Sequence, residues 1–293
     1  MAIGIEARTR RVAPFALTTP IVLVLLVMVI APMTLMLVYS FFTNVAAGRD
    51  AYELTTANWH DAIHDTYYLG GLWKTVRISA IAAIASAIIG YPAAYYVAST
   101  RSRYRWLLLF AFLAPFWISF IIRTFSWVSI LGDNGVINTL LMGLGLRSAP
   151  LKLLYTEFAV LVGLVHYVLP YMLVNLYVVL DGIDENLVPT ARSLGAGGWQ
   201  AFYEITLPLS APGLLVGLFL AFVLAAGSYV TPAILGGSED YMFGNLIFDA
   251  IMVELNWPLG SALSMLLLGL LSIVSLVFAR YVGLGTLYRG LAK

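Results

Sequence analysis

Six long segments of the chain contain no Asp, Glu, Lys or Arg. They lie between Arg11 and Arg49, Arg77 and Arg101, Arg105 and Arg123, Glu157 and Asp181, Glu204 and Glu239, and Glu254 and Arg280. A helix needs about 20 mostly apolar residues to cross the roughly 30 Å hydrocarbon core of a bilayer. One charge at the bilayer centre costs at least about 2.5 kcal/mol. The pattern therefore predicts six transmembrane helices, over residues 15–42, 76–98, 106–122, 158–180, 212–234 and 259–282.

Two other interpretations of the apolar segments are less consistent with the pattern. An outer-membrane β-barrel would show segments of about ten residues that alternate apolar with polar positions, and residues 21–30 and 265–277 do not alternate. Arg8, Arg10 and Arg11 resemble the basic start of a signal peptide. The apolar stretch over residues 15–42 is, however, far longer than the 7–15 residues of a signal-peptide core. We expect a retained helix.

The composition supports an all-α integral membrane protein. Hydrophobic residues make up 61% of the 293 residues and charged residues 11%, whereas a soluble domain carries roughly 25% charged residues. The chain has no Cys, which excludes disulfide frameworks and cysteine metal sites. Because no internal repeat or linker interrupts the pattern, we expect one membrane domain over residues 1–293.

The distribution of basic residues predicts the orientation of the helices. If the N-terminus is cytoplasmic, ten of the sixteen Lys and Arg residues lie inside and six lie outside. Arg101, Arg103 and Arg105 in one short loop are the strongest marker. Cytoplasmic loops are enriched in Lys and Arg, so we expect both termini on the cytoplasmic side.

The most informative segment is the predicted cytoplasmic loop 181–208, between the fourth and fifth helices. Its residues Ile183, Leu187, Ala191 and Leu194 recur at helical spacing and form an apolar stripe. The run Gly195-Ala196-Gly197-Gly198 suits a turn with positive φ. A second helix is expected after it, up to the proline at 208, which cannot donate a backbone hydrogen bond. The sequence of the loop therefore predicts a helix, a tight turn and a second helix.

The same loop resembles a known family motif. Ala191-x3-Gly195-x9-Ile205-x-Leu207-Pro208 is similar to the motif Glu-Ala-Ala-x3-Gly-x9-Ile-x-Leu-Pro of the permeases of binding-protein-dependent ABC importers. In that family the loop is the coupling helix, which docks into a cleft of the ATP-binding subunit. The resemblance implies an importer fold over residues of about 72–284 and coupling roles for Glu185, Ala191, Gly195, Ile205, Leu207 and Pro208.

The resemblance also implies partners and one departure from the family. The expected partners are a second, homologous permease subunit, a dimer of ATP-binding subunits that holds ATP and Mg²⁺, an extracytoplasmic solute-binding protein and membrane lipid. We expect no nucleic acid partner and no cofactor in this chain. Pro189 and Thr190 stand where the family usually has Glu and Ala. Whether Glu185 supplies the missing carboxylate stays open.

Softer motifs resemble the spermidine/putrescine branch of these permeases. They are Pro115-Phe116-Trp117-Ile118-Ser119, Ile122-Arg123-Thr124, Gly163-Leu164-Val165, Leu169-Pro170, Gly244-Asn245-Leu246-Ile247 and Asn256-Trp257-Pro258-Leu259-Gly260-Ser261-Ala262. The resemblance implies import of a polyamine or a related amine. Opines and aminophosphonates, which relatives in this branch carry, remain alternatives. The branch uses two different permeases, so a heterodimer is expected.

Four polar residues are candidates for the solute path: Arg123, Tyr171, Asn175 and Tyr229. Polar groups within spans are costly unless they face a cavity or another helix. Each has a plainer use: Arg123, at the predicted outer end of the third helix, can snorkel to lipid phosphates, and the others can make interhelical hydrogen bonds.

Two other classes of function fit the sequence less well. An intramembrane enzyme would cluster His, Asp or Ser within its spans, and a proton-coupled carrier needs a membrane carboxylate; the six segments contain one His and no carboxylate. The chain has no Gly-x4-Gly-Lys-Ser/Thr loop for ATP phosphates. His60, His64 and His166 lack a spacing typical of metal ligands. We therefore predict no catalytic and no metal-binding residue.

Overall fold

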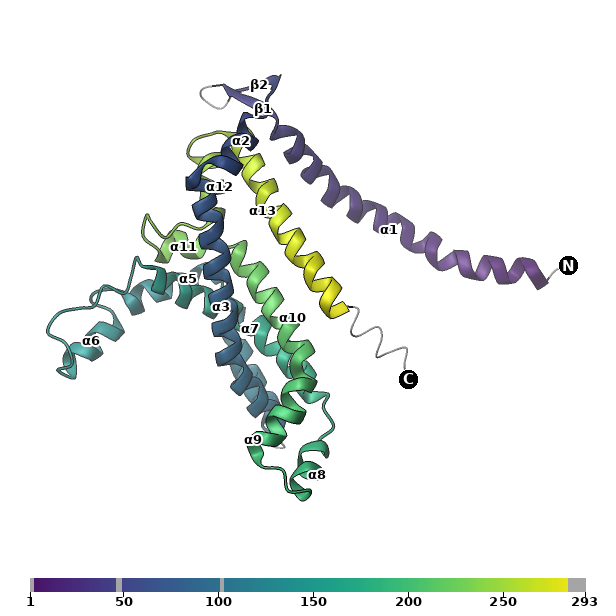
Figure 1. Ribbon diagram of the computed structural model, residues 1–293, viewed down its shortest axis with the longest axis vertical. Coiled ribbons are helices and arrows are strands. Elements are labelled where there is room, and N and C mark those ends of the chain that lie inside the picture. Colours follow the sequence, from purple (N-terminus) through teal and green to yellow (C-terminus); the bar gives the residue numbers. More distant parts are fainter. Residues whose placement is uncertain (1–2, 46–48, 101–102, 284–293) are drawn as a thin grey trace. The chain divides into compact units, whose positions relative to one another are not determined.

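The computed structural model of the chain describes residues 3–45, 49–100 and 103–283 (Figure 1). The chain forms two compact units. The first contains the chain up to Asp65 together with Asp249–Leu266, and the second contains Thr66–Phe248 and the described residues from Leu267 onward. Helices dominate both units.

The first unit contains one long apolar helix and a hairpin that the sequence did not indicate. Its elements are α1 (Ile3–Tyr39), β1 (Phe42–Val45), β2 (Arg49–Leu54), α2 (Ala57–His64), the end of α12 (Phe243–Met252) and the start of α13 (Trp257–Phe278). The two strands pair antiparallel. Asn58 Nδ2 donates to the carbonyl oxygens of Ser40 and Phe42, at 2.9 and 2.8 Å. Trp59 Nε1 donates to Ser40 Oγ at 2.9 Å. These bonds join α2 to the end of α1.

The second unit is built around three long helices that pack side by side: α3 (Thr66–Ser99), α7 (Glu157–Asp181) and α10 (Leu207–Ala226). Ile78, Leu164 and Met172 are fully buried among them. The remaining elements of this unit are α4 (Arg105–Leu113), the 3₁₀ turn η1 (Ala114–Trp117), α5 (Phe120–Leu131), α6 (Val136–Gly143), α8 (Leu187–Ser193), α9 (Gly198–Ala201), the π-helical turn η2 (Phe202–Thr206), α11 (Val230–Leu235) and the π-helical turn η3 (Ala279–Gly283).

Two glycines on α10 let it approach α7 closely. A Cβ atom at Gly217 would lie 2.6 Å from Met172 Sδ, and one at Gly213 would lie 2.8 Å from the Asn175 carbonyl oxygen. Small residues at such positions are typical of helix contacts in membranes, where close backbone approach supplies the attraction. The α7–α10 contact therefore depends on the absence of a side chain at Gly213 and Gly217.

We expect Gly213→Ala to destabilise the second unit. The new methyl group would clash with a backbone oxygen that cannot rotate away, and overpacking of this kind costs about 1–3 kcal/mol. Thermal unfolding in detergent measures the effect. Gly269→Ala on α13 is the matched control, because a Cβ there meets no atom within 4 Å. Equal melting temperatures for the two variants would contradict the close contact.

The third predicted helix, residues 106–122, was wrong as a single straight span. The chain forms α4 and η1, breaks at Ile118 and Ser119, and continues as α5, with a bend of 91° between the two arms. Ile118 and Ser119 have extended ψ angles of 141° and 134°. The N–H of Ile118 closes the 3₁₀ turn on the Pro115 carbonyl, and the Ser119 carbonyl accepts the N–H of Arg123 at the start of α5, so one helical turn ends here and a new helix begins. A segment without charges can thus still be broken, because apolarity does not enforce helical geometry.

The fifth predicted helix, residues 212–234, was placed too far toward the C-terminus. The structure has α10 from Leu207 to Ala226, a break at Gly227, and the separate helix α11 from Val230. Pro208 lies in the first turn of α10 and just after the π-helical turn η2 (Phe202–Thr206), which is wider than a regular helix and accommodates a residue without an N–H. The proline therefore stands within a helical run.

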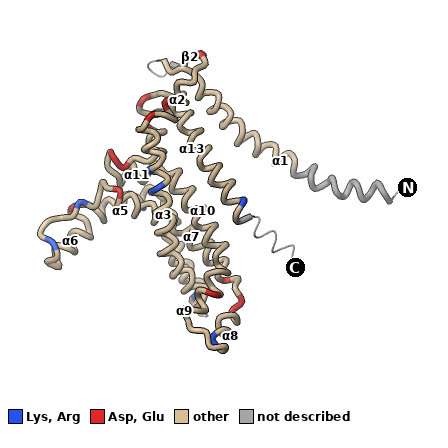
Figure 2. The backbone as a smooth tube through the Cα atoms, in the orientation of Figure 1, with Lys and Arg blue, Asp and Glu red and all other residues tan. Residues whose placement is uncertain are grey.

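The number of predicted spans is confirmed. Five helices of the described chain are long and apolar enough to cross a membrane, and the bent pair made by α4–η1 and α5–α6 would be the sixth. Figure 2 shows the tube of α7 and that of α10 without charged residues along their middles. The chain is an all-α membrane protein apart from the short hairpin.

Candidate functional site

The loop 181–208 contains the predicted tight turn. Helix α8 ends at Ser193, and Gly195 follows with φ of +94°. The N–H of Ala196 donates to the Ala191 carbonyl oxygen at 3.0 Å, and the N–H of Gly195 donates to that of Arg192, also at 3.0 Å. This pattern satisfies the last carbonyls of a helix and needs a residue that accepts positive φ. Gly195 therefore allows the chain to reverse direction between the first arm of the loop, α8, and the second arm, the helix that begins at Gly198.

The second arm of the loop is continuous with the transmembrane helix α10. Residues Gly198–Ala226 form one helical run of 29 residues, made of α9, the π-helical turn η2 and α10. The wider π-helical turn lies directly before Leu207 and Pro208, where a proline ring would crowd the carbonyl four residues earlier in a regular helix. The second arm of the loop and the span therefore form one continuous helical run, with Pro212 inside it.

Three large apolar side chains of the loop are mostly exposed. The exposed fractions are 85% for Leu194, 72% for Trp199 and 59% for Tyr203. The rings of Trp199 and Tyr203 stack with centroids 6.0 Å apart. Contiguous exposed apolar side chains mark interaction sites. We call Leu194, Trp199 and Tyr203 the loop patch.

The predicted apolar stripe was partly wrong. Helix α8 begins only at Leu187, after Asn186 at its N-cap, so Ile183 lies outside the helix. Ile183 packs instead against the buried cluster of the second unit. The carboxylate of Asp184 accepts the N–H of Asn186 at 2.9 Å, which favours a turn over a helix at this point. Of the stripe, Leu187 and Leu194 are exposed and Ala191 is half-buried.

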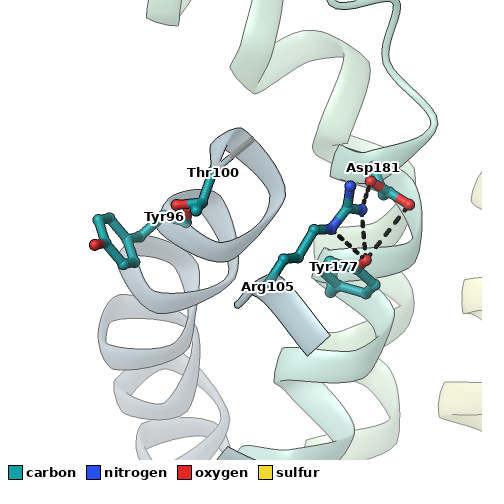
Figure 3. Close-up of polar contacts among 5 residues, drawn as sticks. All are labelled: Tyr96, Thr100, Arg105, Tyr177 and Asp181. Atoms are coloured by element: carbon teal, nitrogen blue, oxygen red, sulfur yellow. Dashed lines mark hydrogen bonds and ion pairs between the residues drawn. The ribbon is translucent and has the colours of Figure 1, made fainter. Parts of the chain in front are cut away.

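A polar cluster fastens the base of the loop (Figure 3). Arg105, at the start of α4, forms an ion pair with Asp181 at the end of α7. Its Nε donates to the Tyr177 hydroxyl at 2.9 Å, and its guanidinium lies 5.3 Å from the centre of the Tyr177 ring. Charge-assisted bonds of this kind are stronger and more directional than neutral ones. The cluster therefore fixes where the loop leaves the membrane helices.

A cavity of about 500 Å³ adjoins this cluster, and Glu185 contributes to its wall together with Arg105, Asp181 and Arg192. Glu185 is exposed and precedes α8. Sequence reasoning used Arg105 only as a marker of orientation. Its link to Asp181 could not be found from the sequence, because 76 positions separate the two residues.

A second pocket lies against the middle of α7. It measures about 310 Å³ and is lined by Phe116, Arg123, Tyr167, Pro170, Tyr171, Val174 and Asn175. Three of the four predicted path residues line it: Arg123, Tyr171 and Asn175. The guanidinium of Arg123 lies 4.6 Å from the centre of the Phe116 ring. The bend between α4 and α5 is what turns Arg123 toward α7.

The fourth predicted path residue, Tyr229, lies elsewhere. Its ring stacks on Phe248 at 5.4 Å, and its carbonyl oxygen accepts a hydrogen bond from Asn245 Nδ2 at 2.8 Å. Tyr229 does not line the Arg123 pocket. Sequence reasoning missed Tyr167 and Phe116 as lining residues; the polar spacing of Tyr167, Tyr171 and Asn175, at i, i+4 and i+8 on one face of α7, could have indicated the first of them.

Comparison with known proteins shows to which family the chain belongs. Residues 86–284 match the model of the family described as binding-protein-dependent transport system inner membrane component. The spermidine/putrescine transport system permease protein PotB of Haemophilus influenzae is 36% identical over 256 residues, which cover 87% of this chain and 89% of the relative. The chain belongs to this family. The permease is therefore a multi-pass inner-membrane component of an ABC importer, and ATP is hydrolysed by another subunit.

Other relatives agree with the family. PotB of Escherichia coli is 32% identical over 256 residues, covering 87% of this permease and 93% of the relative. A crystal structure of a bacterial ABC transporter involved in the import of alginate matches with a TM-score of 0.72 at 16% identity, covering 98% of this permease and 99% of that chain. At such low identity the structural match supports the fold alone. The importer fold expected from the loop motif is thus confirmed.

Proposed function

We propose that this permease forms the membrane path of an importer for a small amine. The observation that carries the proposal is the 36% identity to a spermidine/putrescine permease over most of both chains, together with a loop that has the turn at Gly195. The second permease subunit is a homologous but different chain. A dimer of ATP-binding subunits supplies ATP and Mg²⁺, and an extracytoplasmic protein delivers the solute.

The loop patch is the proposed docking surface for the ATP-binding subunit. Leu194, Trp199 and Tyr203 expose apolar area that would gain roughly 25 cal/mol per Å² on burial. Gly195 shapes the turn, and Ala191 and Glu185 lie on the arm before it. The rest of the family motif, Ile205, Leu207 and Pro208, joins the loop to α10. Helix-in-groove docking of such a surface is a common recognition mode.

The proposed orientation places both termini and the loop 181–208 in the cytoplasm. It rests on the ten-to-six division of Lys and Arg residues between the two sides. We expect an alkaline phosphatase fusion after Lys293 to be inactive and one after Arg147 to be active, because the enzyme folds only outside the inner membrane. The reverse pattern of activities would contradict this topology.

Transport by the assembled complex tests the proposed function. The permease would be purified with its associated subunits, placed in liposomes, and supplied with ATP and its binding protein. We expect ATP-dependent uptake of labelled putrescine, spermidine, 2-aminoethylphosphonate or another small amine. Uptake of none of these amines would contradict the proposal.

A further inference from the structure

We infer that Arg105 and Asp181 are positioning residues of the transport cycle, because their ion pair makes α4 move together with the first arm of the loop 181–208. The inference rests on the proposed docking of that loop with the ATP-binding subunit and extends it to a membrane helix. Figure 3 shows the pair between the start of α4 and the last residue of α7. The loop begins at this last residue, so a displacement of the loop acts first on Asp181.

Arg105 is held by two side chains of α7. Its guanidinium pairs with the carboxylate of Asp181, its Nε donates to the Tyr177 hydroxyl at 2.9 Å, and its charge lies 5.3 Å from the centre of the Tyr177 ring. The Tyr177 hydroxyl donates in turn to the Asp181 carboxylate at 3.5 Å. Tyr177 and Asp181 are four residues apart and so lie on one face of the helix. The three side chains form a closed set of contacts, which fixes their geometry more narrowly than a single ion pair would.

Two simpler roles do not account for this arrangement. A positive charge that only marks the cytoplasmic side can stay in water, as Arg103 does two residues earlier, whereas only 26% of the Arg105 side chain is exposed. A carboxylate at the end of a helix meets the negative end of the helix dipole, which is unfavourable. Asp181 therefore does not stabilise α7 by its own position. The two residues serve the connection between α7 and α4.

Helix α4 depends on this connection because the rest of it packs loosely. None of the nine described residues of α4 is buried. An apolar cavity of about 150 Å³ lies between α4 and the helices α3 and α7, and Leu109 and Phe112 of α4 line it together with Ala94 and Leu173. Close-packed side chains resist a shift of one helix against another. The free volume beside α4 removes part of that resistance, so the position of α4 follows its ion pair.

A movement of α4 reaches the pocket that contains Arg123. Helix α4 continues directly into η1, and Phe116 of η1 lines this pocket and lies 4.6 Å from the Arg123 guanidinium. Pro170, which also lines the pocket, stands inside α7 and removes a helical hydrogen bond there. The cytoplasmic end of α7 can therefore tilt at Pro170 and carry α4 with it through Asp181 and Arg105. Such a tilt would shift the Phe116 side of the pocket.

Exchange of the two charges tests the inference in the complete importer in liposomes, with putrescine as the probe. Arg105→Glu and Asp181→Arg each bring like charges together and should lower the putrescine uptake per ATP hydrolysed by about tenfold or more. The ATPase should still co-purify, because the loop patch is unaltered. The double variant Arg105→Glu/Asp181→Arg restores an ion pair and should recover most of the lost uptake. Arg103→Glu, the same change of charge at an exposed position, is the matched control and should transport at the unaltered rate.

Three results would overturn the inference while amine transport stands. The first is unaltered uptake per ATP in both single variants. The second is a double variant that recovers nothing, or a control Arg103→Glu that loses as much as Arg105→Glu, because the total charge of the region would then matter and not the pair. The third is loss of the ATPase, or of the permease itself, from the membranes of the single variants, because the pair would then only stabilise the fold.

Uptake of no amine by the unaltered importer would overturn the proposed function itself, and a distance measurement then decides the inference without transport. The chain has no Cys, so spin labels can be placed by Trp106→Cys on α4, Thr190→Cys on α8 and Tyr96→Cys on α3, all exposed positions. The other subunits would carry no cysteine. When ATP binds, the distance between labels at 106 and 190 should stay constant while that between 106 and 96 changes. With Arg105→Gln the first distance should change as well. A constant distance between 106 and 96, or the same behaviour with and without Arg105→Gln, would overturn the inference.

Discussion

The variant Leu194→Asp is expected to insert into the membrane normally but to lose the ATP-binding subunit. The Leu194 side chain is 85% exposed at the tip of the loop, and its burial in an apolar cleft would contribute about 1.5–3 kcal/mol. An aspartate would instead bring an unpaired charge into that cleft. We expect the affinity between the subunits to fall by about 100-fold or more. Co-purification of the ATPase from detergent measures the loss.

A matched control separates docking from folding. Leu194→Met keeps a flexible apolar side chain of similar volume and should keep both co-purification and ATP hydrolysis stimulated by the binding protein. Full recovery of both activities with Leu194→Asp would mean that the loop patch does not face the ATPase, and the docking proposal would be withdrawn.

The second large effect is expected for Gly195→Val. Gly195 has φ of +94°, a conformation that costs an ordinary residue about 1–2 kcal/mol and a β-branched one more. The strained turn would misplace both arms of the loop. ATP-driven uptake should fall at least about tenfold, while the amount of the variant in the membrane stays unchanged, because the turn lies outside every span.

The same substitution two residues later provides the control. Gly197 has φ of −70° and ψ of 162°, which valine adopts readily, and a Cβ there meets no atom within 4 Å. Gly197→Val should therefore transport at close to the unaltered rate. If both variants transport equally well, the positive φ at Gly195 has no functional importance.

The positions of most spans could be predicted from the charge-free segments, because charged side chains are costly in a bilayer. The same rule says little about where each helix begins, ends or bends. The limits of α7 matched within a residue at each end, since Glu157 and Asp181 bound it. The start of α3 was placed ten residues late, at 76 in place of Thr66. Lys74 and Arg77 lie within that helix and are compensated by the carbonyl oxygen of Glu239 and the carboxylate of Glu157. Such pairing between residues far apart in the chain cannot be predicted from the sequence alone.

Of the residues in the candidate site, only those on the same helix could be predicted from the sequence to lie together. Tyr171 and Asn175 stand four residues apart, so helical periodicity places both on one face. Arg123 joins them only because the chain breaks at Ile118 and Ser119 and turns by 91°. No periodicity can predict contacts across a break, since the direction of the second arm depends on tertiary packing.

The helical run Gly198–Ala226 has a mechanical consequence. It carries Trp199 of the loop patch at one end, and its Gly213 lies against the carbonyl of Asn175 in the pocket wall. At 1.5 Å per residue, a helical run of 29 residues is about 43 Å long. Pivoting it by about 10° around its Ala226 end would swing the Gly198 end by roughly 7 Å and shift the turn beside Gly213 by about half as much. A push of the ATPase on the loop would thus act as a lever on the walls of the pocket, without any signal passing from side chain to side chain.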